Sequence, residues 1–204
     1  MNRYIPINLK AYYNHKMVYK QLPKGNRKNE FGLDNICILK SDVKLKEQEI
    51  LEGVEFNFSF GKFDNIVCDR QKIIINAKAT KLHLIGFAYW GDTNEYFKVI
   101  YDDLTQEIIK IPFIDWSHKP YRDSRSIDWY GENTSTVRTV IVSGELTHLV
   151  YFHHTVCEIM QRKTIKEIVL PDNMLTHIFA ITLENESKNK ENTNKGEEKW
   201  EQSN

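Results

Sequence analysis

The sequence lacks several features by which broad classes of protein are recognised. It contains only three cysteines, Cys37, Cys68 and Cys157, with no CxxC spacing, which favours free buried thiols over a disulfide framework. Lys plus Arg and Asp plus Glu are balanced at 28 each, so the formal net charge is zero. Because the chain has no basic excess to bind phosphates, we expect no nucleic-acid partner.

Long apolar runs are also missing. No stretch approaches the roughly 20 consecutive apolar residues of a membrane-spanning helix, and residues 1–8 contain no apolar signal segment. We therefore expect a cytoplasmic protein with no membrane partner. The chain has neither a glycine-rich phosphate loop nor a dinucleotide fingerprint, and no long segment shows the 3.6-residue period of an amphipathic helix.

What the chain does contain is a succession of short β-strand patterns. The most informative stretch, 81–116, begins with an alternation over 81–86 that indicates a strand with at least one packed face. Residues 96–101 are dense in aromatic and β-branched side chains, and 107–111 alternates charged and aliphatic residues up to Pro112. This stretch predicts three consecutive strands.

Similar patterns recur along the rest of the chain. Alternation places four apolar side chains on one strand face, namely Val54, Phe56, Phe58 and Phe60. Further strands are expected at 66–68, 72–76, 137–142, 149–153, 165–170 and 178–183. Many short strands separated by turn signals predict an all-β sandwich or jelly roll of two antiparallel sheets. We expect one such domain over residues 1–184, followed by a disordered polar tail over 185–204.

Three runs in order carry a family resemblance: DNIVCDRQKIII (64–75), KLHLIGFAYWGDT (81–93) and IPFIDW (111–116). Together they resemble galactose-binding-domain-like β-sandwich modules, which accompany bacterial glycoside hydrolases. The resemblance implies a jelly-roll fold and carbohydrate recognition. It also implies a structural Ca²⁺ bound by loop carboxylates, for which Glu184 at the end of the last strand is the matching residue.

A sugar site needs an aromatic platform for the apolar C–H faces, flanked by polar groups that bind the hydroxyls. Three loops supply both kinds of side chain. The predicted ligand-binding residues are Trp90, Asp92, Asp115, Trp116, Trp129 and Tyr130. The alternative is that Trp90 and Trp116 are buried anchors, since Trp is highly buried on average. Counting antiparallel reversals places the Trp90 and Trp116 loops at opposite ends of the sandwich, unless a strand is missed or a bulge intervenes, so whether both Trp residues line one pocket stays open.

The preferred function is a noncatalytic carbohydrate- or glycoconjugate-binding module, and no catalytic residue is predicted. A second hypothesis is a small-sugar or metal-assisted enzyme that uses His148, His153 and Glu158. Against a metal site, His153 and the adjacent His154 should point to opposite faces of one strand. A third hypothesis is a structural protein whose exposed aromatic loops pack on another protein or on a second copy of the chain.

Overall fold

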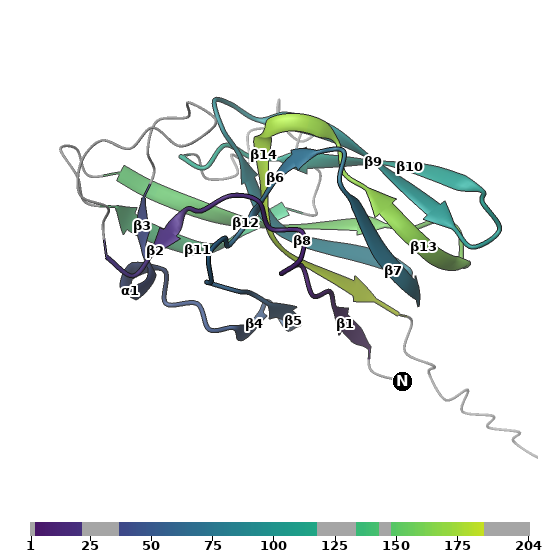
Figure 1. Ribbon diagram of the computed structural model, residues 1–204, viewed down its shortest axis with the longest axis horizontal. Helices are drawn as coiled ribbons and strands as arrows, with labels where there is room; N and C mark the ends of the chain where they lie inside the picture. The colour runs from purple at the N-terminus through teal and green to yellow at the C-terminus, as the bar shows by residue number, and fades with distance from the viewer. Residues whose placement is uncertain (1–2, 22–36, 118–133, 143–147, 186–204) are drawn as a thin grey trace, which may run out of the picture.

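The structure, a computed structural model, describes residues 3–21, 37–117, 134–142 and 148–185 (Figure 1). In these ranges it is almost entirely β-structure, as the sequence predicts. The strands are β1 (Tyr4–Pro6), β2 (Val18–Tyr19), β3 (Ile38–Leu39), β4 (Gln48–Leu51), β5 (Val54–Asn57), β6 (Ile66–Asp69), β7 (Lys72–Lys78), β8 (Lys81–Ala88), β9 (Thr93–Tyr101), β10 (Gln106–Phe113), β11 (Thr134–Val142), β12 (His148–Glu158), β13 (Thr164–Val169) and β14 (Asp172–Glu184). One short helix, α1 (Lys40–Val43), follows β3.

Two antiparallel sheets form the sandwich. The larger sheet has six strands in the order β1-β14-β8-β12-β11, with β6 also pairing with β14, and the smaller has the order β10-β9-β13-β7 (Figure 1). Strand β14 follows all the others in sequence, yet it lies inside the larger sheet between β8 and two earlier strands. The predicted sandwich of two antiparallel sheets is confirmed.

The first hydrophobic core fills the space between the two sheets. Leu82 and Leu84 of β8 belong to this core together with Phe97 and Val99 of β9. These side chains are two residues apart along their strands, and side chains at that spacing share one face of a sheet. The period-2 pattern of the sequence therefore builds this core directly.

A second core covers the opposite face of the six-stranded sheet. Ile85 and Phe87 of β8 and Phe152 of β12 pack there in one cluster with Val18 and Phe56 from the N-terminal segments. Strands β2 to β5 and α1 thus form a third layer, seen along the lower left of Figure 1. Because β8 is covered on both sides, it reads as a nearly continuous apolar run rather than a half-exposed strand.

The alternating residues of 54–60 belong to this third layer. Val54, Phe56 and Phe58 are buried as predicted, and Phe60 is half-buried. The strand pairs only with β4, in a hairpin outside the two main sheets. Thr182 of β14 ties the hairpin to the sheet, since its hydroxyl donates a hydrogen bond to the Glu55 carbonyl at 2.7 Å.

At Gly86 of β8, the neighbouring strand β14 leaves no room for a side chain. The register between these strands shifts between Ile178 and Ala180, and a Cβ atom on Gly86 would lie 2.4 Å from the carbonyl oxygen of His177. No larger residue fits there without moving the backbone.

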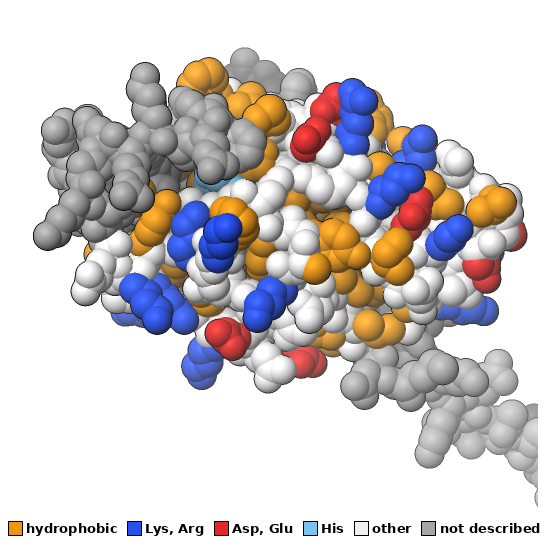
Figure 2. Space-filling model, viewed as in Figure 1, with side chains coloured by type: hydrophobic (Ala, Val, Ile, Leu, Met, Phe, Trp, Pro, Cys, Tyr) orange, Lys and Arg blue, Asp and Glu red, His pale blue; other side chains and the backbone are white. Residues whose placement is uncertain are grey.

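All three cysteines are free, as predicted. Cys68 and Cys157 are buried, and burial raises the pKa of the Cys157 thiol to about 12. Across the described ranges, no helix is both long and apolar enough to span a membrane. Lys and Arg side chains are distributed over the length of the molecule with Asp and Glu among them (Figure 2).

Candidate functional site

The loops that carry Trp90 and Trp116 lie together at one end of the sandwich, which we call the loop end. Strands β9 and β10 form an antiparallel hairpin in which Phe113 pairs with Thr93. Two chain reversals therefore return β10 to the end at which β8 stops. The Trp116 amide donates to the Ala88 carbonyl at 3.0 Å. The count that placed the two loops at opposite ends is wrong, because it missed that two reversals restore the original end.

Asp115 fastens the two loops to each other. Its carboxylate accepts hydrogen bonds from the Gly91 amide at 2.6 Å and from the Ser117 amide and hydroxyl at 2.8 and 2.5 Å. Its own amide donates to Asp92 Oδ1 at 2.6 Å. Asp115 is only 4% exposed, so its carboxylate holds the loops in place instead of facing solvent.

The turn fastened in this way presents Trp90 to solvent. The Trp90 residue is 72% exposed, so it is not the buried anchor of the alternative interpretation. Its φ angle of 63° lies in the left-handed region, which is costly for a residue with a Cβ atom and persists only where surrounding contacts impose it. Trp116 differs, because it is half-buried with its ring centroid 5.8 Å from that of Tyr89.

The remaining predicted residues have different outcomes. Asp92 is half-buried at the loop end, whereas Trp129 and Tyr130 lie outside the described residues. His153 Nε2 lies 3.3 Å from the Asp115 carbonyl oxygen, while His154 is on the opposite face, as expected for adjacent strand residues.

The two described residues of the enzyme hypothesis, His153 and Glu158, do not form a cluster. Glu158 is five positions beyond His153 on β12, so the two side chains leave opposite faces of the strand, and the side chain of His148 is outside the described part. Among the described residues, no group of three His, Cys, Asp or Glu side chains is arranged to hold a metal ion.

Sequence reasoning missed a line of hydrogen-bonded ionisable groups on the face of the six-stranded sheet that carries the second core. His83 Nε2 lies 3.0 Å from Glu184 Oε2, and His83 Nδ1 lies 3.0 Å from His154 Nε2. His154 Nδ1 lies 2.8 Å from Glu52 Oε2. We call these four residues the Glu–His–His–Glu row. It crosses β14, β8 and β12 in their spatial order and ends on the turn between β4 and β5.

Both ends of the row have further partners. Arg3 donates from Nε and Nη2 to Glu184 Oε1 at 2.9 and 2.7 Å, and the Ser135 hydroxyl donates to Glu52 Oε2 at 2.6 Å. The two Glu184 oxygens are thus occupied by Arg3 and His83. These neighbours do not fit the structural Ca²⁺ that the family resemblance implies at Glu184, because a cation would have to displace a guanidinium.

The contacts of the row shift its proton affinities. Burial opposes ionisation of Glu184, but hydrogen bonds from Arg3 and His83 outweigh it and lower the carboxyl pKa. Glu52 behaves similarly: hydrogen bonds from Ser135 and His154 outweigh burial and lower its pKa. For His83, burial lowers the pKa and the Glu184 carboxylate offsets only part of that effect.

A second polar cluster lies elsewhere on the same face. Asn65 Oδ1 is 3.1 Å from His15 Nδ1 and 3.0 Å from His177 Nδ1. Burial lowers the pKa of His177 to about 3, so this imidazole is neutral in the folded protein. The carboxylate of Asp64, next to Asn65, accepts hydrogen bonds from the Met17 and Val18 amides, each at 3.0 Å. These bonds fix the start of β2.

Comparison with protein families identifies the family of this chain. Residues 25–187, well over half of the chain, match the family model of the AziU2-like beta-sandwich domain. The described architecture agrees with that description, since two antiparallel sheets pack face to face. No curated protein matches the chain.

Proposed function

We propose that this chain, which belongs to the AziU2-like beta-sandwich domain family, is a noncatalytic module that binds a carbohydrate or glycoconjugate at the loop end. The proposal includes the finer topology of a galactose-binding-like jelly roll. Trp90 is the platform on which a sugar ring stacks.

The exposed and braced Trp90 is the observation that carries this proposal. An indole face stacks on the C–H face of a sugar, and covering it removes apolar surface from water. The turn is already held by hydrogen bonds to Asp115, so little conformational freedom is lost when a ligand binds. A large aromatic side chain kept in solvent on a rigid turn is suited to such stacking.

The other loop-end residues have distinct roles in this proposal. Trp116, seated against Tyr89, forms the wall beside the platform, and Asp92 supplies a polar group at its edge. Asp115 positions the turn without touching the ligand. Trp129 and Tyr130, which lie outside the described residues, remain proposed ligand contacts.

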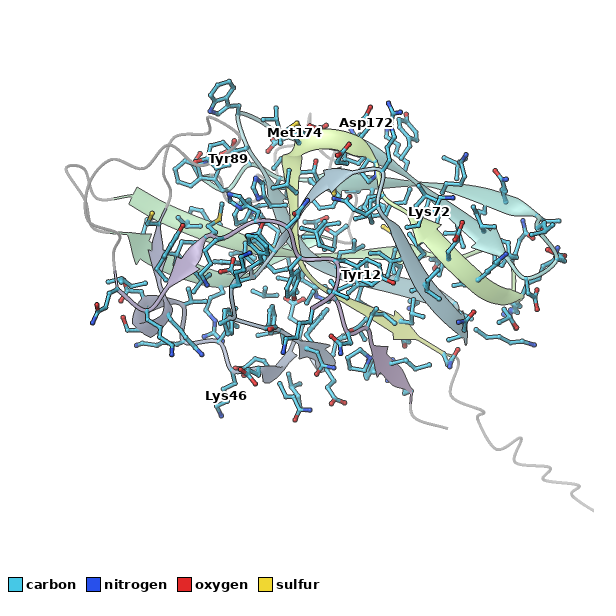
Figure 3. The ribbon with its side chains drawn as sticks, in the orientation of Figure 1. Tyr12, Lys46, Lys72, Tyr89, Asp172 and Met174 are labelled. Atoms are coloured by element: carbon cyan, nitrogen blue, oxygen red, sulfur yellow. The ribbon has the colours of Figure 1, made fainter. Side chains whose placement is uncertain are left out.

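A protein partner or a second copy of the chain is the second candidate, and one observation favours it. The amide of Tyr89, the residue before Trp90, donates to the carbonyl of Leu175, the residue after Met174, at 2.8 Å. Met174 is itself exposed, and Figure 3 shows Tyr89 and Met174 along the same upper edge of the molecule. Exposed Trp and Met side chains close together are also typical of protein interfaces.

A glycan array probed with the wild-type protein and with Trp90→Ala tests the proposal. We expect specific glycan binding that Trp90→Ala weakens by about tenfold, because one stacked aromatic ring contributes about 0.5–1.5 kcal/mol beyond the apolar area that it buries. Tyr96→Ala is the matched control, since Tyr96 is 61% exposed on the four-stranded sheet, away from the loop end. Equal glycan binding by wild type and Trp90→Ala would refute the proposal. A blank array together with concentration-dependent association lost in Trp90→Ala would establish the second candidate instead.

A further inference from the structure

We propose that the Glu–His–His–Glu row holds a single shared proton on its two imidazoles and in that state latches the β4–β5 hairpin onto the six-stranded sheet. His154 lies on the opposite face of β12 from His153, which contacts Asp115 of the loop end, and no residue of the row is among the proposed ligand contacts. This inference therefore does not rest on the proposed carbohydrate site.

The number of protons follows from the three contacts of the row. Ionised Glu184 and Glu52 only accept hydrogen bonds, so the imidazole nitrogens facing them must both carry hydrogen. The 3.0 Å contact between His83 Nδ1 and His154 Nε2 needs one hydrogen as well. The two rings then share three N–H hydrogens, one more than two neutral imidazoles possess. The fully bonded row therefore contains one imidazolium.

The geometry of the row allows the shared proton on either ring. His83 donates from Nε2 to Glu184, and His154 donates from Nδ1 to Glu52. The third hydrogen lies between His83 Nδ1 and His154 Nε2, and either nitrogen can carry it.

Charges around the row balance only when this proton is present. Arg3 and one imidazolium offset the two carboxylates, so these groups together carry no net charge. Lys81 acts electrostatically on His83 and on Glu184, and the Tyr4 ring packs edge-on against His83. The titratable groups near the row on this face are Arg3, Tyr4, Lys81 and Glu158, the last paired in register with Lys81.

Gain or loss of one proton opens the row at its most exposed member. When both rings are neutral, only two N–H hydrogens remain for three contacts, so two lone pairs face each other at one of them. Glu52 is the residue of the row that can turn toward water, because its side chain is 46% exposed. With two imidazolium ions, two N–H groups and two positive charges meet at the central contact. The latch is therefore closed only over a window of pH in which one proton is shared.

Release affects the hairpin and leaves the sandwich intact. Glu52 occupies the tight turn between β4 and β5, with φ of 51°. The hairpin keeps its hydrogen bond from Thr182 and its buried Phe56, so opening begins at the turn. Local openings of this kind are measured by the exchange of backbone amide hydrogens.

The test combines imidazole ¹⁵N NMR with amide protection factors of β4 and β5 across pH 5 to 9. Near neutral pH we expect the ¹⁵N spectra to show three N–H hydrogens on the two rings. The amide protection factors of β4 and β5 should fall by about tenfold at both lower and higher pH, as expected for the loss of one hydrogen bond to a charged group. Glu52→Gln should abolish this pH dependence. Glu55→Gln, a change on the same hairpin at an exposed side chain outside the row, should leave it intact.

Two results would overturn the proposal. One is a pair of neutral imidazoles in the pH range where the hairpin is protected. The other is hairpin protection that does not vary with pH, or varies equally in wild type and Glu52→Gln. Both variants change exposed side chains and are expected to fold, so a negative result counts against the latch.

Discussion

Replacing Gly86 with alanine should be among the most damaging single-methyl changes in this protein. The added Cβ would lie 2.4 Å from the His177 carbonyl oxygen and 3.0 Å from the Phe113 ring. A carbon and an oxygen atom do not approach within about 3 Å, so β8 and β14 must separate by roughly 0.6 Å or more. Both strands are interior to the six-stranded sheet, where neither can shift without disturbing its other neighbour.

The magnitude follows from what this separation disrupts. Overpacking a well-filled core costs about 1–3 kcal/mol, and a buried backbone group that loses its hydrogen bond costs about 1–3 kcal/mol more. Alanine also lowers the conformational entropy of the unfolded chain, which stabilises the folded protein by less than about 1 kcal/mol. We therefore expect Gly86→Ala to lower the free energy of unfolding by roughly 3 kcal/mol, a large part of the 5–15 kcal/mol typical of a domain.

Urea denaturation with two control variants measures this effect. At Gly61 the nearest atom to an added Cβ is 4.0 Å away, so Gly61→Ala should change stability by less than about 0.5 kcal/mol. Gly53 has open space but a φ of 79°, so its alanine variant should cost about 1 kcal/mol from backbone conformation alone. If the urea midpoint of Gly86→Ala equals that of Gly61→Ala within experimental error, the close approach of β14 to Gly86 does not limit stability and the prediction is wrong.

Two further predictions concern the polar groups. Asp115→Ala should increase hydrogen exchange of the Gly91 and Ser117 amides by about tenfold or more, because these amides lose their acceptor. It should also lower the affinity for any ligand bound through Trp90. Unchanged exchange would show that Asp115 does not brace the loops. Burial lowers the pKa of His177 from an ordinary value near 6.5 to about 3. Between pH 3 and pH 6.5 this histidine therefore binds a proton in the unfolded chain but not in the folded one. Stability should therefore be complete above pH 6.5 and fall by about 1.4 kcal/mol per unit as pH drops toward 3. Denaturation midpoints of wild type and His177→Phe against pH measure this slope, and equal slopes would contradict it.

The strands were predictable because their patterns are local. Val54, Phe56 and Phe58 alternate in the sequence and are buried in the structure. The third layer was not predicted, although β8 carried a signal for it: residues 82–88 are apolar or small at nearly every position, as in strands covered on both faces. The sequence analysis assigned this strand at least one packed face but expected no layer on its second face.

The polar sites were harder to predict because their members are far apart in sequence. Glu184 is 101 positions from His83, and Glu52 is 102 positions from His154. A histidine between Leu82 and Leu84 does suggest a buried polar group that needs a partner, but no sequence pattern names that partner. Of two predicted ligand contacts, Trp90 is exposed at the loop end, which excludes the buried-anchor alternative, whereas Asp115 is the brace beneath it.

The position of β14 has a consequence for how the protein is made. This strand completes the middle of the six-stranded sheet, next to β8, β1 and β6, yet it follows all of them in the chain. On the ribosome, β8 and β1 emerge long before the strand that joins them, and until then their open edges can pair with other chains. The sheet can close only after β14 has been synthesised, so β8 and β1 keep unpaired edges for as long as the chain between them and β14 is being made.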